Sequence, residues 1–257
     1  MSIASEISRL NTAKADIKTA IQNKGVSVPS TTKIDGYPSL VNQIQTFDPY
    51  NGHDYVEIGG LKWATMNIGA NSVTDYGLYF QWGDTSGYLS GQCGSSGTTY
   101  AKPFNWADYK FSGGRTSPDA TGMTKYNSSD NKTVLDLSDD AARTNWGGSW
   151  RMPTTAEFAA LGAAVNTAWT ANYQGSGVAG MVCTDKTDSS KVLFFPAAGD
   201  CGNGSVNFVG SNCSYWSSSL RTDNTTNGRS LYFYNRSVYW QSISGRCAGF
   251  SVRGVVG

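Results

Sequence analysis

The sequence predicts an α+β domain preceded by a separate helical segment. Apolar residues recur at helical spacing over residues 2–23. From residue 55 onward, short runs of alternating apolar and polar residues predict strands, and two segments between them carry helix-capping signals. The 30 glycines and 14 tyrosines in 257 residues indicate many turns around an aromatic core.

Residues 1–46 form the helical segment. A helix from Ser2 to about Asn23 is expected to end at Gly25, and Pro38 begins a short helix that runs to Ile44. Apart from Lys14, the a and d heptad positions are apolar: Ile3, Ile7, Leu10, Ile17 and Ile21. So short a heptad run is marginal as an isolated coiled coil. The segment is either a helical hairpin packed on its own domain or an oligomerisation and attachment segment, and we favour the second.

Residues 47–54 are expected to form a linker, because Pro, Gly and Asn are concentrated there. The globular domain, residues 55–257, then opens with a β-hairpin over residues 55–64 whose turn is Gly59-Gly60.

Further along the domain, strand and helix signals alternate. Buried strands are expected over residues 76–83 and 192–195. Ser138 is expected to cap a short helix, and Thr154 with Glu157 forms a capping box for a helix that reaches about Trp169. The expected core tryptophans are Trp63, Trp82, Trp146, Trp150 and Trp216. Arg151 and Arg253 are expected to be buried or half-buried with protein partners.

Composition disfavours several classes of function. A net charge of +1 with 15% charged residues does not indicate nucleic-acid binding. No apolar run approaches the ~20 residues that a membrane helix requires, so no membrane insertion is expected. The single histidine, His53, lies in the linker away from any serine signature, which disfavours a Ser-His-Asp triad. The five cysteines form no CxxC pair, which disfavours a metal site. A disulfide between Cys201 and Cys213 is one possible pairing. We expect no enzymatic activity, no cofactor and no metal.

Residues 199–257 combine a stiff apolar frame with short polar and aromatic side chains. Strand alternation is expected to turn Leu231 and Phe233 inward and Tyr232 and Tyr234 outward. Exposed Tyr, Ser, Asn, Gly and Arg on a rigid sheet are typical of an antibody paratope. The tail therefore predicts a binding surface before it predicts an active site.

The tail also has an unusual composition. From Val192 to the end no Lys, Glu, Met or His occurs. Substituting the adenines of an AAC codon can give residues that include Asn, Ser, Thr, Tyr, Ile, Cys, Arg, Gly, Ala, Asp and Phe, but it cannot give Lys, Glu, Gln, Met or Trp. Residues 242–248, which show no strand period, fall entirely within that reachable set.

Ordered motifs in the domain resemble a known family. They occupy residues 61–67, 146–154, 195–199, 209–212, 215–219 and 249–253. Together they resemble diversity-generating-retroelement variable proteins with a C-type-lectin fold, the group also known as the Fibrobacter succinogenes major paralogous domain. In such proteins adenine-directed mutagenesis rewrites selected surface codons while the scaffold stays fixed. The resemblance implies a C-type-lectin fold for residues 55–257 and a variable face within residues 199–248.

The resemblance and the residue types together predict a non-catalytic ligand-binding face. We expect its contacts to come from Asn203, Ser205, Asn207, Phe208, Asn212, Tyr215, Tyr232, Tyr234, Arg236, Tyr239, Ser242, Ile243, Ser244, Arg246 and Ala248. Phe208 and Ile243 would supply apolar anchors, and the tyrosines would add contact area with a polar tip. Weak binding at one site would be amplified if several copies engage one surface.

Residues 9–18, 28–30 and 33–37 resemble the N-termini of phage tail and baseplate proteins. This implies a receptor-binding protein of the virion, in the tail fibre or baseplate, that recognises a host cell-surface protein or glycan and contacts other tail proteins through its N-terminal segment. A homotrimer is expected from the habit of the family. Charged residues interrupt the apolar stretch that a signal peptide would need, so we expect synthesis in the bacterial cytoplasm without a signal peptide.

Two alternatives stay open. The first is a bacterial surface adhesin or carbohydrate-binding module with a fixed face. The second, a formylglycine-generating-type enzyme, shares this general fold but uses paired cysteines, and no matching pair occurs in the core here. The Glu-Pro-Asn and Gln-Pro-Asp motifs of Ca²⁺-dependent lectins do not occur either.

Overall fold

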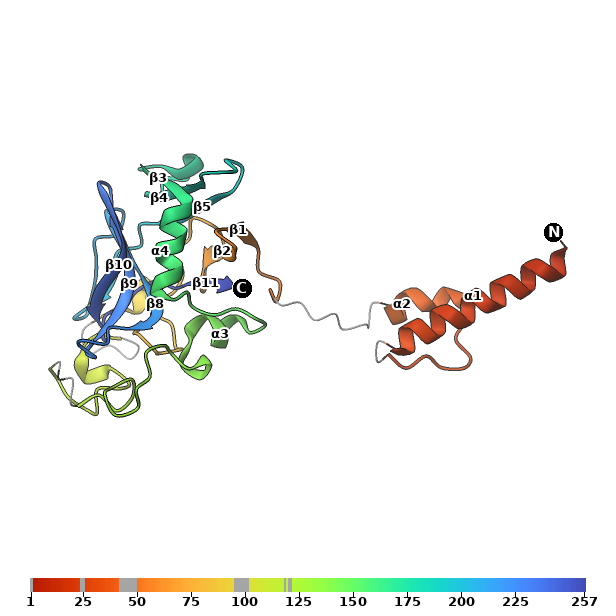
Figure 1. Ribbon diagram of the computed structural model, residues 1–257, viewed down its shortest axis with the longest axis horizontal. Coiled ribbons are helices and arrows are strands. Elements are labelled where there is room, and N and C mark those ends of the chain that lie inside the picture. Colours follow the sequence, from red (N-terminus) through yellow and green to blue (C-terminus); the bar gives the residue numbers. More distant parts are fainter. Residues whose placement is uncertain (1, 24–25, 42–49, 95–101, 118, 120–121) are drawn as a thin grey trace. The chain divides into compact units, whose positions relative to one another are not determined.

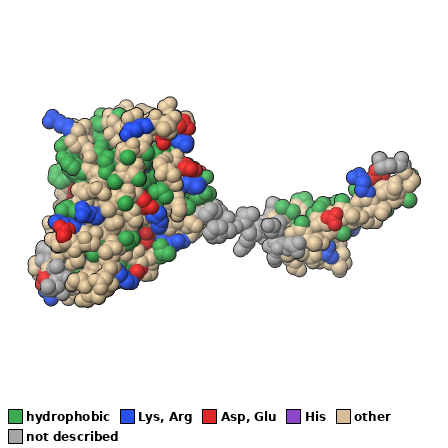
Figure 2. Space-filling view, viewed as in Figure 1, with side chains coloured by type: hydrophobic (Ala, Val, Ile, Leu, Met, Phe, Trp, Pro, Cys, Tyr) green, Lys and Arg blue, Asp and Glu red, His purple; other side chains and the backbone are tan. Residues whose placement is uncertain are grey.

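The computed structural model describes residues 2–23, 26–41, 50–94, 102–117, 119 and 122–257. The chain divides into two compact units, Met1–Asp48 and Pro49–Gly257, with the boundary inside the expected linker. Both helices and antiparallel sheets are present, so the larger unit is of the α+β class (Figure 1). In the view of Figure 2, acidic and basic side chains of the larger unit are interspersed, without an extended patch of one sign.

The smaller unit contains α1 (Ile3–Asn23), a 3₁₀ turn (Ile34–Gly36) and α2 (Tyr37–Val41). The last three residues of the expected second helix, 42–44, lie outside the described residues. Ile21 is buried in a small core with Val26, Val28 and Tyr37. The rest of the predicted stripe is exposed: Ile3, Ile7, Leu10 and Ile17. No helix in the described part of the chain is both long and apolar enough to cross a membrane.

The first sheet of the larger unit pairs strands from the beginning and the end of that unit. It contains β1 (Tyr55–Ile58), β2 (Leu61–Asn67) and β11 (Arg253–Val256), in the order β1-β2-β11. The predicted hairpin is confirmed, and its turn glycines, Gly59 and Gly60, have φ of +61° and +80°, where a side chain would be strained. β11 pairs antiparallel with β2, so the last strand closes the unit.

The second sheet corrects one helix prediction. It contains β3 (Val165–Thr170), β4 (Gly180–Asp185) and β5 (Val192–Pro196), in the order β3-β4-β5. The capping box is confirmed, since the Thr154 hydroxyl accepts from the Glu157 amide at 3.2 Å. However, α4 (Thr155–Ala164) does not reach Trp169. Val, Thr and Trp favour extended backbone, and residues 165–170 pair with β4 instead.

Two further predictions are wrong in detail. Ser138 does not cap α3 (Ala141–Trp146); the cap is Asp140, whose Oδ1 accepts from the Arg143 amide at 2.9 Å. Residues 76–83 make only isolated bridges, because Gly77 and Gly83 adopt φ of +70° and +80° and interrupt a regular strand. Short 3₁₀ turns also occur at Ser90–Gln92, Trp106–Asp108, Leu137–Asp139 and Tyr173–Gly175.

The third sheet contains the three longest strands of the tail. It contains β8 (Asn212–Leu220), β9 (Asn227–Tyr234) and β10 (Ser237–Gly245), in the order β10-β9-β8, and β6 (Asp200–Gly202) pairs with β7 (Ser205–Asn207) in a separate hairpin. α4 contacts all three strands of the third sheet (Figure 1). Residues 242–245, for which no strand period was expected, continue β10 in register with β9.

The aromatic core is as predicted. All five expected tryptophans are buried, and Trp63, Trp82, Trp150 and Trp216 have almost no exposed surface. Arg253 is fully buried and donates to the carbonyls of Ala64 and Phe194, each at 2.9 Å. Arg151 is half-buried and donates to Glu157. Both arginines therefore belong to the frame, as expected.

Candidate ligand-binding face

One side of β9 faces the core and the other carries candidate contacts. Leu231 and Phe233 are buried, whereas Tyr232 and Tyr234 are half-buried. Successive strand side chains point to opposite faces. The predicted alternation is confirmed, and the apolar residues fix which side of the sheet the tyrosines occupy.

Three tyrosines form a cluster on this side. The ring centroids of Tyr232 and Tyr239 lie 5.9 Å apart, and those of Tyr234 and Tyr239 lie 6.3 Å apart. Tyr239 is opposite Tyr232 in the β9–β10 register and keeps 50% of its surface exposed. A tyrosine ring has only two side-chain torsions, so the cluster offers a large contact area at low entropic cost.

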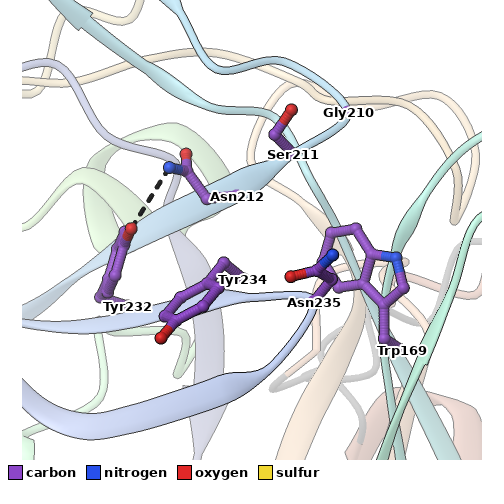
Figure 3. A pocket seen from close by; sticks show the side chains of 7 residues that line it. All are labelled: Trp169, Gly210, Ser211, Asn212, Tyr232, Tyr234 and Asn235. Atoms are coloured by element: carbon purple, nitrogen blue, oxygen red, sulfur yellow. Dashed lines mark hydrogen bonds between the residues drawn. The ribbon is translucent and has the colours of Figure 1, made fainter.

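A first hollow, the Trp169 hollow, lies beside this cluster (Figure 3). It measures about 400 Å³ and is lined by Trp169, Gly210, Ser211, Asn212, Tyr232, Tyr234 and Asn235. The Asn212 Nδ2 donates to the Tyr232 hydroxyl at 3.3 Å, while its Oδ1 has no hydrogen-bond partner among the described residues. The hollow thus combines an indole and two phenol rings, while the unpaired Asn212 Oδ1 is itself buried.

A second hollow, the Asp200 hollow, lies on the other side of Tyr232. It measures about 360 Å³ and is lined by Asp200, Cys201, Gly202, Ser214, Ser230, Tyr232, Ser242, Ile243, Ser244, Ala248 and Phe250. Four strands, β6, β8, β9 and β10, contribute to it. Five of its residues come from the predicted contact set: Tyr232, Ser242, Ile243, Ser244 and Ala248.

Asp200 gives this hollow its electrostatic character. Burial raises the pKa of the Asp200 carboxyl above its usual range, and a hydrogen bond from Asn207 opposes that shift only in part. The Asn207 Nδ2 lies 3.3 Å from Asp200 Oδ1. Asp200 and Asp223 are the two acidic residues of the tail, and Asp223 is exposed and paired with Arg221. The hollow therefore contains a desolvated carboxylate without a counter-ion among the described residues.

The β7–β8 connection supplies an apolar tip. Phe208 is 62% exposed and has a φ of +61°, which is unusual for a bulky residue. The Phe208 carbonyl accepts from the amides of Ser211 and Asn212, so hydrogen bonds to two residues of the next segment hold this conformation. Phe208 is thus presented to solvent by a fixed turn, as an apolar anchor would be.

The predicted contacts fall into three groups. Those in or beside the two hollows and the tyrosine cluster are Asn207, Asn212, Tyr232, Tyr234, Tyr239, Ser242, Ile243, Ser244 and Ala248. Those exposed elsewhere on the tail are Asn203, Ser205, Phe208 and Arg236. Tyr239 and Ser242 also line a third hollow, of about 490 Å³, between α4 and β10. The remaining two, Tyr215 and Arg246, are buried.

Tyr215 and Arg246 were wrongly predicted as contacts, because each fills the interior. Tyr215 is fully buried, and its hydroxyl accepts from Asn67 at 3.1 Å and donates to the Pro196 carbonyl at 3.3 Å. The Arg246 guanidinium carbon lies 4.7 Å from the Trp82 ring centroid, inside an aromatic cage. Arg246 lies just past the end of β10, where the chain turns inward, so its reachable codon did not mean an exposed side chain.

The cysteine prediction is also corrected. Cys201 is bonded to Cys93, not to Cys213, which is a buried free thiol whose pKa burial raises to about 12. Cys93 lies in the Gly- and Ser-rich loop region after residue 83, and it was not paired in the sequence argument because the five cysteines are widely scattered. The disulfide ties that loop to β6, next to Asp200.

The lining residues that were missed from the sequence include Trp169, Asp200, Ser214 and Ser230. Ser230 could have been found, because it is two residues before Tyr232 on the same strand and so shares its side of the sheet. Ser214 requires the β8–β9 register, which places it opposite Tyr232. Trp169 was missed because the sequence predicted a helix up to this residue, whereas it belongs to β3.

Within the described residues there is no cluster of three or more His, Cys, Asp or Glu side chains that could hold a metal ion. His53 stacks on Trp146, with ring centroids 4.0 Å apart. Comparison with known protein families, with curated proteins and with solved structures finds no match for this chain.

Proposed function

We propose that the protein is a non-catalytic ligand-binding protein whose larger unit has a C-type-lectin fold with a retroelement-diversified face. The observation that supports this most is the division of the tail into two sets of residues. Frame motifs are buried, as at Trp216, Phe250 and Val252. Codon-reachable side chains such as Tyr239 and Ile243 are exposed on the same sheet. Replacing the exposed set leaves the core contacts untouched, which limits the reorganisation that binding requires.

The N-terminal unit supports a role in assembly. Ile3, Ile7, Leu10 and Ile17 leave an apolar stripe exposed on α1. Fully burying an Ile side chain is favourable by about 1.5–3 kcal/mol, so association of several copies along this stripe is stabilising. We place the protein in a phage virion as a homotrimeric receptor-binding protein that recognises a host cell-surface protein or glycan. Trimerisation would add avidity to each single face.

Two experiments test this function. Sequencing the DNA around the gene should find a reverse transcriptase and a near-copy of the tail-coding segment that differs at adenines. Labelled full-length protein should bind intact cells of a susceptible bacterium, and the Tyr232→Ala/Tyr234→Ala/Tyr239→Ala variant should not. Tyr173→Ala, which changes a tyrosine outside the face, is the matched control. Retained cell binding by the triple variant, or a flanking region without reverse transcriptase and repeat, would contradict the proposal.

A further inference from the structure

Asp200 differs from the other desolvated acids of the larger unit. Asp139 contacts Lys110 and Lys125, Glu157 contacts Arg151, and Asp140 accepts from two backbone amides. Asp200 has a side-chain amide at 3.3 Å and no cation among the described residues. A half-buried carboxylate is costly to leave unpaired, so its environment is suited to a positive group supplied from outside.

Two hydroxyls next to Asp200 point to the same conclusion. Ser214 and Ser230 are 6% and 1% exposed, and both line the Asp200 hollow. No side-chain hydrogen bond of either serine occurs among the described residues, and neither oxygen is among the fully buried atoms that lack a partner. Both oxygens are therefore open to the hollow and can accept a hydrogen bond from a group within it.

The shape of the hollow narrows the chemistry of that group. Three of its lining residues are apolar, Ile243, Ala248 and Phe250, while Asp200, Ser214 and Ser230 lie on other strands than Ile243. A primary ammonium has three donors and no acceptor, which suits one carboxylate and several hydroxyl oxygens. A planar guanidinium prefers a bidentate carboxylate without competing groups. An aliphatic stem is needed to cover the apolar wall, and a lysine side chain has one.

We propose that the Asp200 hollow is a subsite for a primary ammonium on an aliphatic stem, supplied by a lysine side chain of a protein ligand. This rests on the proposed function, because it specifies what the binding face recognises. Asp200 is the anchor of the subsite, Ser214 and Ser230 accept from the ammonium, and Ile243 packs on the stem.

The backbone on both sides of the anchor is fixed by residues outside the predicted contact set, although the Asn207 amide that donates to Asp200 belongs to that set. Gly199 has a φ of +69°, and a Cβ there would lie 1.9 Å from the Asn207 carbonyl oxygen, so only glycine fits before Asp200. Cys201, directly after it, is fixed by the disulfide to Cys93. Different tails on this frame would therefore share the ammonium anchor, while residues 242–244 change the wall around it.

The test measures binding of small probes to the full chain by saturation-transfer NMR. Nα-acetyl-lysine N-methylamide is compared with the norleucine analogue, which keeps the stem without the ammonium. The lysine probe should bind saturably. Asp200→Asn should weaken it at least about 10-fold, since a hydrogen bond to a charged group is lost. Asp223→Asn, the same change at the exposed tail acid, should leave it unchanged. Ser230→Ala should weaken it about 2- to 10-fold without altering any charge.

Each outcome decides the proposal. Equal binding of the norleucine probe, or less than twofold weakening by both Asp200→Asn and Ser230→Ala, would overturn it. Tighter binding of protonated glucosamine than of the lysine probe would also overturn it, by assigning the hollow to an amino sugar. If the lysine probe binds but the protein does not bind cells, the subsite is supported and the receptor role is refuted. If the protein binds cells but the lysine probe does not bind, only the subsite is refuted.

Thermal stability tests the role of Asp200 independently of probe binding. Because burial raises the pKa of Asp200, the folded state holds its proton more tightly than the unfolded state, and the ionised carboxylate is destabilising at neutral pH. Asp200→Asn should therefore keep or raise the thermal midpoint at pH 7 while it removes probe binding. A lower midpoint would mean that Asp200 has a structural role instead of a binding role.

Discussion

Arg246→Met should destabilise the larger unit as a whole. The guanidinium of Arg246 donates to the Tyr109 hydroxyl at 2.7 Å and to the carbonyls of Lys125, Tyr126 and Thr225 at 2.9–3.2 Å. These partners belong to two loops far apart in the sequence. The Arg246 side chain thus joins the end of β10 to both loops by hydrogen bonds. Methionine keeps most of the aliphatic part of that side chain but has no hydrogen-bond donor.

The magnitude follows from the groups left behind. Three carbonyls lose their donor, two of them in partly buried surroundings, while the Tyr109 hydroxyl keeps its hydrogen bond to the Trp82 carbonyl. An unsatisfied buried polar group costs about 1–3 kcal/mol, so the lower figure predicts a loss of about 3 kcal/mol in the free energy of unfolding. For a domain of this size such a loss corresponds to a fall of about 6–12 °C in the thermal midpoint.

Differential scanning calorimetry of the full chain measures this, with Arg236→Met as the matched control. Arg236 is an exposed arginine in the β9–β10 turn, and its replacement should shift the midpoint by about 2 °C or less. Equal midpoints for the two variants would refute the assignment of Arg246 to the frame.

Three further predictions concern other parts of the chain. Ile7→Asp should reduce the molar mass measured by light scattering, because it places a charge on the exposed α1 stripe, while Thr12→Asp should not. Cys201→Ser should lower the free energy of unfolding by about 2–5 kcal/mol in urea titrations, and added reductant should then have no further effect. Burial alone would raise the pKa of Glu157, but hydrogen bonds from Arg151 lower that pKa below the usual value of 4.5 for a glutamate. The stability it contributes is therefore present above pH 4.5 and lost as pH falls through the lowered pKa, and Glu157→Gln should flatten that acid limb.

Elements with local signals were predictable from the sequence. The β1–β2 hairpin has a Gly-Gly turn, α4 has a capping box, and β9 has strict alternation, so each is specified by neighbours in the chain. The helix prediction failed at Val165, because pairing with β4 outweighs a helical pattern that continues across Ala163 and Ala164.

The candidate site was predictable only along single strands. Alternation placed Tyr232 and Tyr234, and the same rule would have placed Ser230. Asp200 joins the site through strand pairing and the hollow between strands, which no local pattern encodes. The burial of Arg246 depends on loops more than a hundred residues earlier, as its bond to Lys125 shows. Residue type and codon class could not separate it from exposed Arg236.

Replacing the exposed and half-buried side chains of the face at random, while the frame is kept, measures most directly whether the two sets of residues are independent. Positions 232, 234, 239 and 242–244 are replaced by mixtures of the AAC-reachable residues, and the thermal midpoints of purified variants are determined. Because surface substitutions change stability by about 0.5 kcal/mol or less each, most midpoints should stay within about 10 °C of the parent and most variants should unfold cooperatively. Widespread unfolding, or a spread as large as that of a matched library at buried Leu231, Phe233 and Trp216, would show that the face is part of the core and would contradict a diversified binding surface.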